Sequence, residues 1–185
     1  DIGCGYRPLK SATVIADVQD FSKFYTDKKF IRIKEKILPF KDKEFDFVIA
    51  SHVIEHVHDP VNFVKLAYQC LKPKGILYID TPNIESSGAR IFGKNWRGIE
   101  SPRHLVLFSE VGLRTALQNV GFNQVVFFPR KEVRKNIALK SYRMQRGLSP
   151  YNESLKKMPL KDTLRCYLPI RRDREEFLTL VASKD

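Results

Sequence analysis

Short runs of apolar, often β-branched residues recur along the chain and are separated by segments of mixed polarity. Runs of this kind are typical of strands that are buried on both faces of a sheet. They occupy residues 12–18, 45–50, 75–80, 122–128 and 176–182. The pattern therefore predicts a sheet whose strands are spread over the whole sequence.

Two of the intervening segments predict α-helices. The first begins at Asp59-Pro60, an N-cap followed by a proline at the first helical position, and has apolar residues at helical spacing as far as Leu71. The second begins at Ser109 and ends at Gly121. Strands that alternate with helices predict an α/β fold with a parallel sheet.

The segment from residue 130 to residue 174 separates the last two predicted strands and differs in composition. It contains 14 Lys and Arg residues against 4 Asp and Glu residues, and it carries most of the net charge of +12. A structureless loop of that length is unusual inside a compact domain. Val133 and Ile137 indicate one basic helix, and residues 155–168, interrupted by Pro159, indicate a second. We therefore expect a single domain over residues 1–185 with a basic, helical insertion at about 130–174.

The composition excludes several classes of protein. Hydrophobic residues make up 43% of the 185 positions, which is typical of a soluble globular protein, and no apolar run is long enough to cross a membrane. The three cysteines are widely spaced and form no C-x-x-C pair, so neither a zinc ribbon nor a disulfide framework is expected. This cysteine usage indicates a reducing, cytoplasmic location.

A glycine-rich turn opens the sequence. Asp1-Ile-Gly-Cys-Gly5 has the form of the turn that follows the first strand of an open α/β sheet, where glycines let the backbone approach a ligand closely. Asp17 ends the next predicted strand, where a carboxylate can accept hydrogen bonds from both hydroxyls of a ribose. The two features together favour a nucleoside ligand. Alternatively, Asp17 only caps the strand.

Beyond that turn, the chain resembles the class I S-adenosylmethionine-dependent methyltransferases through a series of motifs in the same order. They read DIGCG, VIADV, LPFKDKEFDFVIASHVIEHVHDP, LKPKGILYIDTPN and WRGIESPRHLVLFSEVGLRTALQNVGF. The last motif is similar to the branch that includes the ubiquinone-biosynthesis O-methyltransferases and related bacterial enzymes. The resemblance covers residues 1 to about 128 and the closing strand, and it does not cover the basic insertion. It implies a Rossmann-like, doubly wound, mostly parallel sheet of seven strands, with a truncated first strand and an antiparallel last strand.

The resemblance also implies that the protein is an enzyme with S-adenosyl-L-methionine as its cofactor. Cofactor-binding roles fall on Asp1, Gly3, Gly5, Asp17, Val18, Ser51 and His52. Gly3 and Gly5 would line the methionine and ribose portions of the cofactor, and Asp17 would hold the ribose hydroxyls.

The string His52-Val-Ile-Glu55-His56 is also the H-x-x-E-H pattern of one class of zinc peptidases. That site needs both histidines on one stable helix, together with a third ligand. Here the string follows an apolar strand directly, and Pro60 begins a new helix four residues after His56. We therefore expect no bound metal.

Two histidines are candidates for a general base. In the resembling family, the segments that contain His56 and His104 form facing walls of the methyl-transfer site, and a histidine can deprotonate a hydroxyl at neutral pH. Alternatively, His56 only packs at its turn. Trp96, Arg97 and Arg103 are candidates for substrate binding, although Trp96 is equally compatible with core packing.

The expected reaction is O-methylation of a small or lipid-linked acceptor. The basic insertion is compatible with three roles: a solvated cover over the site, a surface for peripheral contact with an anionic membrane, or a binding site for phosphate groups. Nucleic acid is the less favoured partner, because few aromatic residues are interleaved with the charges. RNA methylation, or a methyltransferase-like binding module without activity, remains an alternative.

Overall fold

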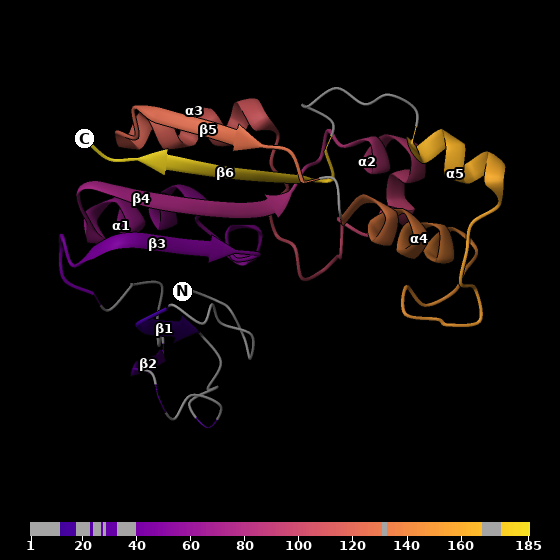
Figure 1. Cartoon of the computed structure of the whole chain (residues 1–185), viewed down its shortest axis with the longest axis horizontal. Coiled ribbons are helices and arrows are strands. Elements are labelled where there is room, and N and C mark those ends of the chain that lie inside the picture. Colours follow the sequence, from indigo (N-terminus) through magenta and orange to yellow (C-terminus); the bar gives the residue numbers. More distant parts are fainter. Residues whose placement is uncertain are drawn as a thin grey trace.

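The computed structural model describes residues 12–17, 23, 27, 29–32, 40–130, 133–167 and 175–185 (Figure 1). The strands are β1 Val14–Asp17, β2 Lys29–Arg32, β3 Phe45–Ser51, β4 Leu71–Pro82, β5 Gln124–Phe128 and β6 Phe177–Ser183. The α-helices are α1 Pro60–Cys70, α2 Ser87–Phe92, α3 Glu110–Val120, α4 Arg134–Gln145 and α5 Leu160–Tyr167. Two short 3₁₀ helices are η2 Ile54–His56 and η3 Gly93–Asn95.

Four strands form a mixed sheet in the order β3-β4-β6-β5. β3 and β4 run parallel, with Val48 opposite Leu77. β6 runs antiparallel to both of its neighbours, and Ala182 lies opposite Leu77 on one side and Val125 on the other. The expected antiparallel last strand is therefore present.

The number of strands differs from the expected seven. Over the described residues there are six strands, and β1 and β2 form a separate two-stranded parallel sheet. In an open sheet of this type, the first strand lies between the second and the fourth and joins the two halves. No described residue takes that place between β1 and β3, so the seven-stranded count remains a prediction.

Helices α1 and α3 pack behind the four-stranded sheet (Figure 1). Their buried residues, such as Val64 and Leu117, join Leu77, Ile79 and Leu180 of the sheet in one apolar core. Both helices begin as the sequence predicts. The Asp59 side chain accepts a hydrogen bond from the Asn62 amide at 2.9 Å, and the Ser109 hydroxyl accepts one from the Gly112 amide at 3.1 Å. Gly121 ends α3 with φ at 117°, a left-handed conformation that favours glycine.

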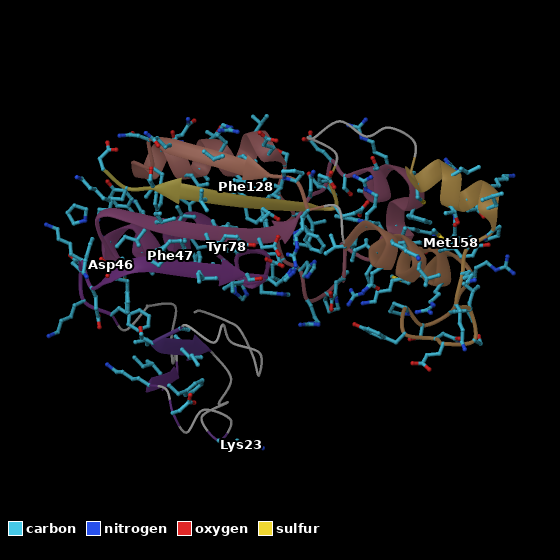
Figure 2. All side chains as sticks on the ribbon, viewed as in Figure 1. Lys23, Asp46, Phe47, Tyr78, Phe128 and Met158 are labelled. Atoms are coloured by element: carbon cyan, nitrogen blue, oxygen red, sulfur yellow. The ribbon has the colours of Figure 1, made fainter. Side chains whose placement is uncertain are left out.

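The opposite face of this sheet carries apolar side chains that point toward the viewer in Figure 2, where Phe47, Tyr78 and Phe128 are labelled. Phe47 is 52% exposed and Phe128 is 46% exposed. A doubly wound sheet has helices on both faces, whereas the described helices cover one face of this sheet.

Strand β4 is longer than expected. The sequence places its start at Gly75, but the strand begins at Leu71, immediately after α1, and Leu71 lies opposite Phe45. Pro73 lacks a backbone N–H and stops the helix, yet proline is compatible with an extended backbone. The irregular register between Phe45 and Phe47 accommodates this first part of the strand.

A second apolar cluster lies beyond the carboxyl end of β4, where α2, α4 and α5 gather (Figure 1). Its buried members are Phe92, Trp96, Ala138, Tyr142 and Cys166. Helices α4 and α5 occupy the two segments for which the sequence indicates basic helices, and α5 begins directly after Pro159. Within the described part of the chain, no helix combines the length and apolar character needed to span a bilayer.

Candidate active site

A cavity of about 310 Å³ lies where β3 and β4 end and β6 begins. It is lined by His52, His56, Pro82, Arg97, Gly98, Glu100, Arg103, His104, Ile137, Lys140 and Phe177. These residues come from the turn after β3, the end of β4, the segment 97–104, helix α4 and the start of β6. The carboxyl ends of parallel strands are the usual place for a ligand in an open α/β sheet.

His52 lies between two buried carboxylates at the end of β3. Its backbone has a positive φ of 56°, and its N–H donates to the Asp80 carbonyl at 2.8 Å. Its Nδ1 atom is 3.1 Å from the Glu55 carboxylate, and its Nε2 atom is 3.5 Å from that of Asp80. Burial alone would lower the pKa of His52, but the bond to Glu55 and the charges of Glu55 and Asp80 raise that pKa above its ordinary value.

The two carboxylates under His52 are fully buried and hydrogen-bonded. Glu55 also accepts a bond from the Thr81 hydroxyl at 3.0 Å, and Asp80 accepts one from the Thr179 hydroxyl at 2.7 Å and pairs with Arg130. Burial would raise the pKa of Glu55. The hydrogen bonds from His52 and Thr81, together with the charge of His52, lower this pKa below its ordinary value. Both groups are satisfied, as buried charges need to be.

His56 and His104 both line the cavity, and their rings are in edge-to-face contact, with centroids 4.8 Å apart. The Nδ1 atom of His56 is 2.8 Å from the Arg103 carbonyl, and that of His104 is 2.7 Å from the Gly98 carbonyl. A carbonyl only accepts hydrogen bonds, so each Nδ1 carries a proton, and Nε2 is the ring atom that can accept one. Burial lowers the pKa of His104 below its ordinary value, which keeps this ring neutral at neutral pH. The fold thus brings together the two candidate bases that the sequence indicates.

The same corner of the site offers ligand atoms for a cation. Ligand atoms of Glu55, His56 and His104 all lie within 4.8 Å of one another. A cation there would compete with His52 and Thr81 for the Glu55 oxygens. His52 lies at a strand end and His56 lies in a single 3₁₀ turn, so the helical arrangement of a zinc peptidase is not formed. The expectation of no bound metal remains a prediction.

Arg97 and Arg103 both line the cavity, and both pair with Glu100. Arg97 Nη1 lies 2.5 Å from one Glu100 oxygen, and Arg103 Nη1 lies 2.5 Å from the other. Arg97 also donates to the Tyr151 hydroxyl at 3.0 Å. Glu100 therefore holds the two guanidinium groups at one edge of the cavity.

Trp96 has a different place from the one expected of a substrate-binding residue. Its side chain is fully buried in the second apolar cluster, and its indole N–H donates to the Glu176 carboxylate at 2.8 Å. Gly98 covers the ring, since a Cβ at that position would lie 2.3 Å from two ring carbons. Trp96 is consequently absent from the lining of the cavity and packs in the core, and its contact with an acceptor remains a prediction.

Helix α4 contributes two lining residues that the sequence alone does not indicate. Ile137 and Lys140 lie one helical turn apart, and both border the cavity. The spacing of apolar residues in the insertion predicts the helix. It does not reveal which face meets the site, because that depends on contacts with residues 96–100.

Three kinds of comparison relate the chain to known proteins. A family model described as a methyltransferase domain matches residues 1–126. The chain belongs to this methyltransferase family. Membership of this family supports an enzyme that uses S-adenosylmethionine.

Curated relatives of the methyltransferase include ubiquinone biosynthesis O-methyltransferases. That of Pelagibacter ubique is 33% identical over 98 residues, which are 45% of this chain and 41% of that protein. The mitochondrial protein of Bos taurus is 45% identical over 49 residues, which are 26% of this chain and 13% of that protein. The matched region therefore spans less than half of either relative.

The fold of the methyltransferase is also that of solved methyltransferases. A SAM-dependent methyltransferase of Thermotoga maritima matches with a TM-score of 0.65 and 19% identity, over 100% of this chain and 80% of that one. At this identity the match supports a shared Rossmann-like α/β fold.

The residues expected to bind the cofactor fall partly outside the described part of the methyltransferase. Asp1, Gly3, Gly5 and Val18 lie outside the described residues, and Asp17 is the last residue of β1. Ser51 ends β3, and His52, which follows it, lines the cavity.

The charged groups of this edge have partners within the chain, and one aromatic ring is left to meet a cationic sulfonium centre. Two buried carboxylates, Glu55 and Asp80, lie beneath His52. The aromatic ring of Phe177 lies against His52, with ring centroids 5.0 Å apart, and it also lines the cavity. The face of an aromatic ring attracts cations, so Phe177 is a candidate contact for the sulfonium of the cofactor.

Proposed function

We propose that the methyltransferase transfers the methyl group to a hydroxyl oxygen of a small or lipid-linked organic acceptor. The observation that carries this proposal is the His56–His104 pair, in which both Nε2 atoms are free to accept a proton beside a cavity at the strand ends. When bound, S-adenosylmethionine supplies a methyl group activated by the sulfonium. The residues of the chain then position the acceptor oxygen and remove its proton.

His104 is the better candidate for the base, because the Glu100 carboxylate lies beside its Nε2 atom and the Gly98 carbonyl holds its Nδ1 proton. Burial lowers the pKa of this ring. The ring is therefore neutral at neutral pH, and Nε2 can accept the hydroxyl proton. Glu100 Oε2 lies 3.6 Å from this Nε2 atom and can stabilise the imidazolium that forms. His56, whose ring contacts that of His104, is the alternative base.

The lining of the cavity supports an acceptor that is apolar in part and negatively charged in part. Ile137 and Phe177 provide apolar surface, and Arg97, Arg103 and Lys140 provide positive charge against the single carboxylate of Glu100. Arginine and lysine bind carboxylate and phosphate oxygens. A hydroxylated ring that carries a carboxylate, or a lipid phosphate, has this combination of groups.

The test separates the role of each histidine as a base from its role as a hydrogen-bond donor. Asparagine places an amide N–H close to the position of histidine Nδ1 but has no counterpart of Nε2. We expect His104→Asn to lose turnover of 3,4-dihydroxybenzoate at least 100-fold while its Kd for S-adenosylhomocysteine, measured by calorimetry, stays unchanged. His56→Asn should retain most of the turnover, and His58→Ala, which changes an exposed histidine of the same turn, is the matched control.

Different outcomes assign different roles. Loss of turnover in His56→Asn alone makes His56 the base. Equal loss of cofactor affinity in a variant assigns that histidine to the cofactor site instead. Methylation of nitrogen or carbon, or of no hydroxyl in a panel that includes catechol and phenol, contradicts the proposed reaction.

RNA methylation receives less support from the described residues. Two arginines of the basic insertion that were candidates for phosphate binding have partners within the chain. Arg134 pairs with Glu175 at 2.9 Å, and Arg143 donates to the carbonyls of Leu155 and Pro150.

We also propose a cytoplasmic setting, supported by the buried free thiols of Cys70 and Cys166.

A further inference from the structure

A second, larger cavity of about 620 Å³ lies between α4 and α5. It is lined by Lys135, Leu139, Lys156, Lys157, Met158, Thr163 and Leu164. Three of these side chains are apolar and three are lysines. We call this cavity the α4–α5 groove. It shares no lining residue with the candidate active site, and the proposed reaction does not use it.

Next to the groove, α5 exposes large apolar side chains. Leu160 is 74% exposed and Leu164 is 57% exposed, and the two lie one helical turn apart on the same face. Lys161 and Arg165 are exposed on the same helix, and Lys156 and Lys157 are exposed just before it. A short helix that combines a leucine edge with lysines is typical of a segment that lies in the interface of a membrane.

The lysines of this region are available for an external partner. In the part of the chain that the structure describes, Lys135, Lys156, Lys157 and Lys161 make no salt bridge to an acidic side chain. They differ in this respect from Arg134 and Arg143, whose guanidinium groups have partners within the fold. The sequence alone does not show which of these lysines and arginines have partners within the fold.

We propose that the α4–α5 groove and its lysine rim dock the methyltransferase onto an anionic phospholipid bilayer. Leu160 and Leu164 enter the boundary between head groups and acyl chains, and the lysines lie against the lipid phosphates. The apolar floor of the groove, formed by Leu139 and Met158, lies under the lysine rim and receives part of an acyl chain. Both the buried apolar area and the positive charge contribute to such binding.

A nucleic acid fits this surface less well. Bases stack on aromatic side chains, whereas the exposed apolar residues of α5 are leucines. Tyr151, which is exposed, lies next to the guanidinium of Arg97 and the ammonium of Lys140 on the side of the candidate active site. The combination of leucines and lysines therefore favours lipid.

Helix α4 connects the groove with the candidate active site. Lys135 and Leu139, four residues apart, line the groove, whereas Ile137 and Lys140 line the catalytic cavity. Residues two positions apart on a helix point in nearly opposite directions. The idea that docking delivers a lipid-linked acceptor across α4 rests on the proposed function. The docking itself does not require that function.

The test measures co-sedimentation of the full chain with large unilamellar vesicles at physiological ionic strength. Vesicles of phosphatidylcholine with 30 mol% phosphatidylglycerol (roughly the anionic content of a charged leaflet) are compared with pure phosphatidylcholine. We expect binding to the anionic vesicles only. Two variants probe the surface: a charge variant, in which Lys156, Lys157 and Lys161 become glutamine, and an apolar variant, in which Leu160 and Leu164 become alanine.

We expect each variant to lower the partition coefficient at least tenfold, since one lysine near an anionic surface is worth roughly a fivefold change in binding. The matched control changes Lys41, Lys65 and Lys74 to glutamine; all three are exposed and lie near the sheet and α1, away from α5. The control should bind the vesicles like the wild type. Thermal unfolding and the Kd for S-adenosylhomocysteine verify that each variant is folded.

Three outcomes overturn the docking proposal: no binding of the wild type to anionic vesicles, wild-type binding by both surface variants, or an equal loss in the control. Salt-dependent binding of a 20-nucleotide poly(U) RNA without vesicle binding assigns the surface to nucleic acid instead. Turnover of the soluble probe 3,4-dihydroxybenzoate is measured in parallel. Lost turnover with intact docking counts against the proposed function only, and lost docking with intact turnover counts against this surface only.

Discussion

Replacing Trp96 with phenylalanine tests whether this residue holds the fold together or contacts the acceptor. The indole N–H donates to the buried Glu176 carboxylate at 2.8 Å, and a hydrogen bond to a charged group contributes roughly 1.5–3 kcal/mol. The smaller phenyl ring also leaves a void in a fully buried site. We expect a total loss of about 3 kcal/mol, at the lower end of the range for removal of a whole tryptophan side chain. For a chain of 185 residues this lowers the Tm by about 6–12 °C.

The assay is thermal unfolding followed by circular dichroism, together with steady-state kinetics on the soluble probe below the Tm. A double-mutant cycle with Glu176→Leu, which removes the acceptor, isolates the hydrogen bond, since the two changes should be strongly non-additive if the residues interact. The reasoning is refuted if Trp96→Phe lowers the Tm by less than about 2 °C and raises the KM for the acceptor. A shift that small is less than the loss of one hydrogen bond to a charged group would produce. That result would indicate that Trp96 contacts the acceptor.

Three further changes have defined outcomes. Gly98→Ala should lower the Tm by several degrees, because the new Cβ would lie 2.3 Å from the Trp96 ring, and overpacking costs about 1–3 kcal/mol. Asp59→Ala removes the N-cap of α1 and should lower the unfolding free energy in urea by about 1 kcal/mol. The pKa of His52 is raised above 6.5, so its contribution to stability is complete below that pH and is lost as the pH rises through the folded pKa. Urea titrations between pH 6 and 9 should show this loss in the wild type and a weaker one in Glu55→Gln.

Local signals in the sequence are enough to predict most of the regular elements. The β-branched runs give β3, β4, β5 and β6, and the caps at Asp59 and Ser109 give the starts of α1 and α3. These features depend on residues that are close in sequence. The same is true of the two helices of the insertion, for which apolar spacing and Pro159 are sufficient signals.

Features that depend on residues far apart in the sequence cannot be predicted from such local signals. Arg134 looks like a surface cation in the sequence, but Glu175, 41 residues away, forms an ion pair with it. Trp96 is compatible with a pocket or a core until Glu176, 80 residues away, is seen to accept its N–H bond. Helix α2 was not predicted, because six residues are too short for a periodic pattern to emerge.

The same distant contacts make the candidate active site depend on the insertion. β6 begins at Phe177, and the two residues before it hold the helical part of the chain: Glu175 binds Arg134 of α4, and Glu176 binds Trp96 and the Gly88 amide of α2. Phe177 itself lines the cavity, as do Ile137 and Lys140 of α4. Pairing of β6 with β4 therefore fixes the position of Phe177 in the cavity wall. The same pairing positions Glu175 and Glu176, which in turn hold α4 and α2. These buried links place Ile137 and Lys140 of α4 in the lining, so the insertion supplies part of the candidate active site itself.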